Sequence, residues 1–81
     1  MRLVGEVPHP ELKITLFSWN NRYLVKFEQG YLEQTYKIDQ FDVSGDEAVK
    51  RILDPVFLDS VSQRFRAMGH DWSLAIQRAD T

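Results

Sequence analysis

Residues 12–38 read LKITLFSWNNRYLVKFEQGYLEQTYKI, and apolar side chains alternate with polar ones through most of this stretch. The alternation is clear in residues 12–16 and again in residues 23–28, which is the period of strands with one buried side. Between these runs lies Asn20-Asn21, and asparagine tolerates the positive φ angles of a two-residue type I′ turn. The sequence therefore predicts an antiparallel hairpin that turns at Asn20-Asn21.

The turn also predicts the register of this hairpin. A two-residue turn pairs Trp19 with Arg22, and that pairing places Leu16 opposite Val25. One face then carries Leu12, Ile14, Leu16, Tyr23, Val25 and Phe27. The other face carries Lys13, Thr15, Phe17, Leu24, Lys26 and Glu28. We expect the first face to contact the core, because it is almost wholly apolar.

A weaker turn signal at Gln29-Gly30 predicts a third strand. A two-residue turn there places Phe27 opposite Leu32, Lys26 opposite Glu33, and Arg22 opposite Lys37. The apolar face gains Leu32, Tyr36 and Ile38, and the other face gains Tyr31, Glu33, Thr35 and Lys37. Residues 1–7 can add a fourth strand, which Gly5 and the following Pro8-His9-Pro10 segment limit to a sheet edge.

Helix signals replace strand signals after Asp39. Ser44-Gly45-Asp46-Glu47 matches the Ser-x-x-Glu capping box, with Ser44 as the N-cap of a first helix. Asp54-Pro55 marks the start of a second helix, Gly69 its end, and Asp71 the cap of a third. The helical aromatic residues Phe57, Phe65 and Trp72 are expected to pack in the core.

This order of elements predicts an α+β fold. We expect an antiparallel three- or four-stranded β-meander followed by three C-terminal helices packed on one sheet face, in one domain spanning residues 1–81. A chain of this length buries about 60–65% of its unfolded surface, which supports a single modest core.

Composition limits the compartment and the partners. The chain has no cysteine, which excludes disulfides, a cysteine nucleophile and the usual structural zinc sites. Its N-terminal apolar run is too short for a signal peptide, and no stretch approaches the ~18 apolar residues of a membrane span. The formal charge of −2 produces no overall field that attracts nucleic acid or anionic lipid. We expect a soluble, cytoplasmic protein without a membrane partner.

The sequence contains no recognisable catalytic constellation. His9 and His70 are the only histidines, and neither has a convincing local partner. A triad with Ser60, Ser62 or Ser73 could assemble only in space, because the chain has no Gly-x-Ser-x-Gly elbow. The acidic residues around the predicted first helix lack the ligand order of a calcium loop, and the glycines form no phosphate cradle. We therefore expect no enzymatic activity, no metal site and no cofactor.

The non-core sheet face is the strongest functional candidate. It combines large aromatic and aliphatic side chains with basic ones, whereas a solvated face does not ordinarily require them. The candidate interaction residues are Phe17, Trp19, Arg22, Leu24, Lys26 and Tyr31. They predict a protein-interaction module that binds a protein partner or forms a homo-oligomer.

Three alternatives remain open at the sequence level. The same face could bind single-stranded nucleic acid, with bases stacked on aromatic rings, although Glu28 and Glu33 interrupt its positive charge. A ligand pocket between helices and sheet could use inward polar groups of Tyr23, Gln34 and Tyr36. Finally, the face could have no binding role, if the N-terminal strand covers its apolar residues and Trp19 stacks on Arg22.

Overall fold

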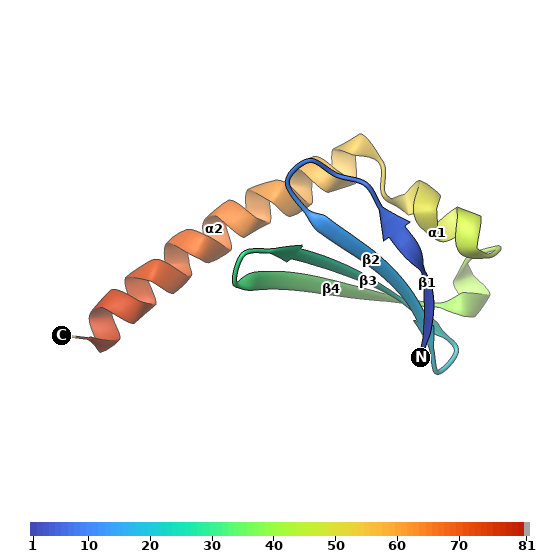
Figure 1. Ribbon diagram of the computed structural model, residues 1–81, viewed down its shortest axis with the longest axis horizontal. Coiled ribbons are helices and arrows are strands. Elements are labelled where there is room, and N and C mark those ends of the chain that lie inside the picture. Colours follow the sequence, from blue (N-terminus) through green and yellow to red (C-terminus); the bar gives the residue numbers. More distant parts are fainter. Residues whose placement is uncertain (81) are drawn as a thin grey trace.

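The computed structural model describes residues 1–80 and contains an antiparallel sheet followed by helices, an α+β arrangement (Figure 1). The sheet has four strands in the order β1-β2-β3-β4. The elements are β1 (Arg2–Val7), β2 (Lys13–Trp19), β3 (Arg22–Gln29), β4 (Leu32–Asp39), η1 (Gln40–Asp42), α1 (Asp46–Ile52) and α2 (Pro55–Ala79). The predicted domain also included Thr81, which lies outside the described residues.

The β2–β3 hairpin has the predicted register at every pair. Trp19 lies opposite Arg22, and the pairing continues to Lys13 opposite Glu28. Asn20 and Asn21 have φ angles of 54° and 63°, as a type I′ turn requires. The side-chain alternation and the turn chemistry therefore favour the same register.

The β3–β4 hairpin differs from the prediction by two residues. Its turn is Gly30-Tyr31, so Gln29 faces Leu32 and Phe27 faces Gln34. Gly30, with φ 60°, takes the first central position, where a type II′ turn places glycine, and not the second. A shift of two residues keeps the paired side chains on their predicted faces, because strand alternation has a period of two, whereas Tyr31 moves into the turn.

The shift also changes the cross-strand charge pairs. Lys26 lies opposite Thr35 and reaches Glu33 diagonally, with 3.8 Å between Nζ and the carboxylate. Arg22 lies opposite Asp39, so the predicted repulsive pairing with Lys37 does not form.

Strand β1 pairs with β2 at the sheet edge, as predicted, with a bulge between Leu3 and Gly5.

The helices differ more from the prediction than the strands do. Gly45, and not Ser44, is the N-cap of α1, and no side chain caps this helix. Helix α2 does begin at the predicted cap, where the Asp54 carboxylate accepts a hydrogen bond of 2.8 Å from the Phe57 N–H. It runs unbroken to Ala79, so the predicted break at Gly69 and the third helix after Asp71 are wrong.

The position of Gly69 explains why α2 continues through it. A Cβ at residue 69 would lie 3.6 Å from a methyl group of Leu32, so the glycine lies against the start of β4. One glycine in a helix interior costs only about 1 kcal/mol, and the flanking helical residues offset it. The 3.6 Å separation is an ordinary van der Waals distance, so the site would also accept a methyl group, and the glycine does not end the helix.

The core lies between the helices and one face of the sheet, the inner face. Its buried side chains are Leu12, Ile14, Leu16, Tyr23, Val25 and Phe27 from the sheet, with Val49, Leu53, Val61 and Phe65 from the helical half. The sheet contributes the face that the alternation predicted. No helix covers the opposite, outer face in residues 1–80, so that face is a candidate interaction surface (Figure 1).

Candidate interaction surface

The outer face is built by side chains that alternate with the core residues. Cross-strand pairing places Leu3, Phe17 and Leu24 in one line across β1, β2 and β3, and this line is called the apolar row. Trp19 lies two residues beyond Phe17 on the same face of β2, opposite Arg22. The strands thus bring four large apolar side chains together at one end of the sheet.

These side chains have no covering element within the described chain. Trp19 is 52% exposed and Leu3 is 60% exposed, while Phe17 and Leu24 are half-buried by their neighbours in the sheet. Strand β1 extends the sheet beside β2 and contributes Leu3, so it enlarges the face and does not cover it. The ring-to-ring contacts in residues 1–80 involve Phe27, Tyr36 and Phe57 in the core, and Trp19 takes no part in them.

The charges on the outer face fall into two regions. Lys26 lies between two carboxylates, with its Nζ 3.7 Å from Glu28 and 3.8 Å from Glu33. Arg22 and Lys37, near the apolar row, form no ion pair with any acid in residues 1–80. Asp39 is opposite Arg22, but its carboxylate accepts a hydrogen bond of 3.0 Å from the Phe41 N–H. Two cations without an ion pair in residues 1–80 therefore lie next to the apolar row, and the Asp39 carboxylate lies opposite one of them.

The structure brings together five of the six predicted interaction residues and separates one. Phe17, Trp19, Arg22, Leu24 and Lys26 share the outer face, as the alternation indicated. Tyr31 is in the β3–β4 turn, at the opposite end of β3 from the Asn20-Asn21 turn, and its side chain is fully exposed. Tyr31 therefore lies apart from the other five residues, because the turn is one residue later than predicted.

Leu3 is the residue of this surface that the sequence prediction missed. The missing information was the register of β1 on β2, which the bulge near Gly5 obscures. Pairing of β1 with β2 starts next to the connecting loop, with Val7 opposite Ile14, and continues to Gly5 opposite Leu16. Leu3 then lies opposite Phe17 only if β1 has one extra, bulged residue between Leu3 and Gly5.

The inward polar groups near α1 form a local network. The Tyr23 hydroxyl donates a hydrogen bond of 2.7 Å to Asp46 Oδ1, and the Arg2 guanidinium lies 3.5 Å from the same oxygen. The hydrogen bond to Asp46 raises the pKa of Tyr23, and burial and the carboxylate charge act in the same direction. Hydrogen bonds from Tyr23 and Arg2 lower the pKa of Asp46. This network joins β1, β3 and α1.

A second polar network joins the sheet to α2. The Gln34 amide donates a hydrogen bond of 3.0 Å to the Val61 carbonyl, and the Tyr36 hydroxyl donates one of 2.7 Å to Gln34 Oε1. No buried side-chain polar atom in the described residues lacks a partner. A cavity of about 180 Å³ near Tyr36 is lined mainly by apolar side chains, including Ile38, Leu53 and Phe57. The polar groups considered for a ligand pocket are thus engaged in contacts within the fold.

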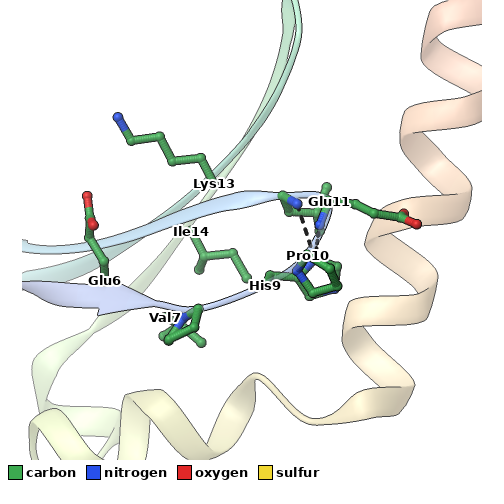
Figure 2. Close-up of a pocket in the computed structure, with 9 residues that line it drawn as sticks. Glu6, Val7, His9, Pro10, Glu11, Lys13 and Ile14 are labelled. Carbon is green, nitrogen blue, oxygen red and sulfur yellow. Dashed lines mark hydrogen bonds between the residues drawn. The ribbon is translucent and has the colours of Figure 1, made fainter.

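The β1–β2 loop forms an open hollow around His9, shown in Figure 2. The His9 Nδ1 accepts hydrogen bonds of 3.1 Å from the backbone N–H groups of Glu11 and Leu12. Asp59 and Ser62 line the neighbouring hollow, but the role of His9 there is to hold the loop.

Residues 1–80 contain no cluster of three or more potential metal ligands among histidine, aspartate and glutamate. Within the same range, neither helix has the combination of length and apolar character needed to cross a membrane.

Comparison of the chain with protein-family models, with curated proteins and with solved structures finds no match. The candidate site therefore has to be interpreted from its own geometry.

Proposed function

We propose that this chain is a non-enzymatic protein-interaction module that binds a partner protein through its outer sheet face. The observation that carries the proposal is the apolar row of Leu3, Phe17 and Leu24 beside exposed Trp19, on a face without a covering helix. A contiguous apolar surface of this kind often marks an interaction site, and tryptophan is among the residues that dominate binding energy.

The charges near the apolar row indicate the chemistry of the partner. Arg22 and Lys37 are exposed and form no ion pair within residues 1–80, while Lys26 is paired with Glu28 and Glu33. A partner that places apolar side chains on the row and carboxylates around them would pair with both of these cations. We therefore propose an acidic partner segment with apolar anchors.

Single-stranded nucleic acid is a weaker candidate for the same face. Four cations lie on it, at Lys13, Arg22, Lys26 and Lys37, and four acids lie on it, at Glu6, Glu28, Glu33 and Asp39. Such a balance does not produce a continuous path for phosphates. Oligonucleotide titration at low and high salt is the matching control, and we expect no salt-sensitive binding.

A peptide selection tests the proposal without a purified partner protein. A random peptide library is displayed on phage and selected on the wild-type protein. Each peptide's enrichment is then compared with its enrichment on the Leu24→Lys variant, which places a charge within the apolar row. We expect enriched peptides that combine large apolar residues with aspartate or glutamate. Their affinity should fall at least roughly tenfold in Trp19→Ala and should weaken as salt rises.

Trp72→Phe provides the matched variant, because it alters the only other tryptophan and leaves Trp19 as the sole fluorescence reporter. The selected peptides should bind Trp72→Phe with wild-type affinity and change its Trp19 emission. Peptides that bind Leu24→Lys and Trp19→Ala as tightly as the wild type, or an enrichment of basic peptides, would contradict the proposal.

A further inference from the structure

Helix α2 is longer than the sheet on which it packs. Its 25 residues span roughly 37 Å, whereas an eight-residue strand such as β3 spans only about 27 Å. Since α1 occupies part of the inner face, α2 continues past the β3–β4 turn, as Figure 1 shows. The last buried residue of α2 is Phe65, and the three turns after Gly69 extend beyond the sheet.

The apolar stripe of α2 does not stop where the sheet ends. Apolar residues recur at alternating intervals of three and four, namely Leu58, Val61, Phe65, Met68, Trp72, Ala75 and Ala79. This is the 3.5-residue spacing of a helix that packs along another helix. The first half of the stripe packs on the sheet, but Trp72 is 55% exposed and, contrary to the prediction, is not a core residue.

The extending half of the stripe borders a shallow groove. The groove is lined by Leu32, Met68, Asp71, Trp72, Ala75 and Arg78. In a heptad abcdefg, Trp72 and Ala75 take positions a and d, whose side chains form the contact line between two packed helices, called the seam here. Asp71 and Arg78 take two successive g positions, which flank the seam seven residues apart. The groove therefore combines a large side chain, a small one, and one charge of each sign.

We infer that the extending half of α2 is a homodimer interface, in which a second copy packs its own α2 antiparallel in this groove. This surface is distinct from the outer sheet face, and the inference stands apart from the proposed function. In the antiparallel arrangement Trp72 of each chain lies against Ala75 of the other, and Met68 lies against Ala79. The large-against-small pairing fills the seam from both sides.

The charges support the same arrangement. With Trp72 packed against Ala75 of the second copy, Asp71 of one chain lies beside Arg78 of the other, and two-fold symmetry forms this pair twice. A parallel pairing would instead place Asp71 near Ile76, because flanking positions then meet five residues apart. Charge complementarity thus favours the antiparallel dimer.

The seam covers about twelve residues, or roughly 18 Å of helix, which is short for an interface. An interface of this size is at the lower end of specific association, so the dimer is expected to dissociate on dilution. Light scattering on the full chain from about 5 to about 500 µM covers the concentrations over which the dimer fraction of such a weak interface is expected to rise. We expect the mass to rise from one chain to two.

Trp72→Ala tests the seam, with Trp19→Ala as the matched control on the outer face. We expect Trp72→Ala to weaken dimerisation at least roughly tenfold and Trp19→Ala to leave it unchanged. Circular dichroism should show that both variants remain folded, because both side chains are largely exposed in one chain. A wild-type mass of one chain throughout, or a dimer lost in Trp19→Ala but retained in Trp72→Ala, would overturn the inference.

A charge exchange tests the antiparallel register itself. Asp71→Arg alone and Arg78→Asp alone should each shift the mass towards one chain, because each places like charges side by side. An equimolar mixture of the two variants should form dimers again, since every Asp71–Arg78 contact is then of opposite sign. A mixture that stays monomeric, or single variants that dimerise like the wild type, would exclude the antiparallel pairing.

The same stripe could instead lie on a lipid surface, and one measurement separates the two possibilities. A protein that stays monomeric but co-sediments with vesicles of phosphatidylcholine and phosphatidylserine, and loses this in Trp72→Ala, would overturn the dimer. We expect no more sedimentation with vesicles than without them.

Discussion

At the scale of single residues, the Tyr23–Asp46–Arg2 network shows how three distant segments are held together. The hydroxyl of Tyr23 and the guanidinium of Arg2 converge on one oxygen of Asp46, which is the first residue of α1. An acidic side chain at this position also complements the positive end of the helix dipole. The network holds α1 against the inner face, where Val49 is part of the core.

The network predicts a defined pH dependence of stability. The pKa of Asp46 is lowered in the folded chain, so its ionised form stabilises the fold above the ordinary carboxyl pKa, and this contribution disappears as pH falls through the folded value. The pKa of Tyr23 is raised, so its protonated form stabilises the fold below its ordinary pKa, and this contribution disappears as pH rises through the folded value. Tyr23→Phe should therefore destabilise the protein most near neutral pH.

Urea unfolding at a series of pH values measures this dependence. The cost of Tyr23→Phe should shrink as pH falls below the ordinary aspartate pKa of about 4 and on through the lowered pKa of folded Asp46. Tyr31→Phe is the matched control, because that hydroxyl is on a fully exposed turn residue, and its stability should equal that of the wild type. A cost of Tyr23→Phe that is the same at pH 3 and pH 7 would refute the coupling.

At the scale of elements, the two helix starts behave differently although both carry a capping signal. The Asp54 carboxylate accepts a hydrogen bond from the Phe57 N–H, whereas Ser44 is outside the cap of α1. Proline at the first position of α2 further fixes where that helix begins. The predicted cap therefore forms at Asp54 and does not form at Ser44.

A pair of alanine substitutions tests this difference. Asp54→Ala should lower the free energy of unfolding by about 1 kcal/mol, the usual contribution of an N-cap side chain. Ser44→Ala should change it by less than about 0.5 kcal/mol, because no cap hydrogen bond is lost. Chemical denaturation of both variants gives the comparison, and equal losses would mean that Ser44 does cap α1 in solution.

The strands were more predictable than the helices for a physical reason. Asn20-Asn21 and the flanking alternation both specify one register, and a slip of one residue would expose the core face. At the β3–β4 turn only Gly30 carried information, and glycine fits the first central position as well as the second. Gly69 resembled a helix end because the packing of α2 along β4 cannot be seen from local sequence.

The residues of the outer face differ in how well the sequence predicts their positions. Phe17, Trp19 and Leu24 were placed together by alternation alone, since they belong to the well-specified hairpin. The position of Leu3 depends on a bulge and that of Tyr31 on the turn, so Leu3 was not predicted and Tyr31 lies apart from the other residues. The exposure of Trp72 depended on where the sheet ends relative to α2, which is a property of the assembled fold.

At the scale of the whole molecule, the chain is more extended than its length requires. The radius of gyration is 14.8 Å, against about 12 Å for a compact domain of this size, and the longest dimension is 50 Å. The excess comes from a two-layer fold with an uncovered outer face and from the part of α2 that extends past the sheet. Each of these features leaves a tryptophan exposed, at Trp19 and at Trp72.

The two exposed tryptophans lie on different surfaces, so the functions proposed for these surfaces can be tested separately. A dimer formed through α2 would leave both outer faces accessible and present two copies of the partner site. Binding of one partner at two sites raises the effective affinity without new contacts.

The measurement that tests the outer face most directly is backbone amide NMR of the folded chain during titration with a peptide selected on it. The proposed function predicts that shifts cluster at Leu3, Phe17, Arg22 and Leu24, with little change along residues 70–79 of α2. Shifts confined to α2 or to the β1–β2 loop around His9, with the outer face unperturbed, would contradict it.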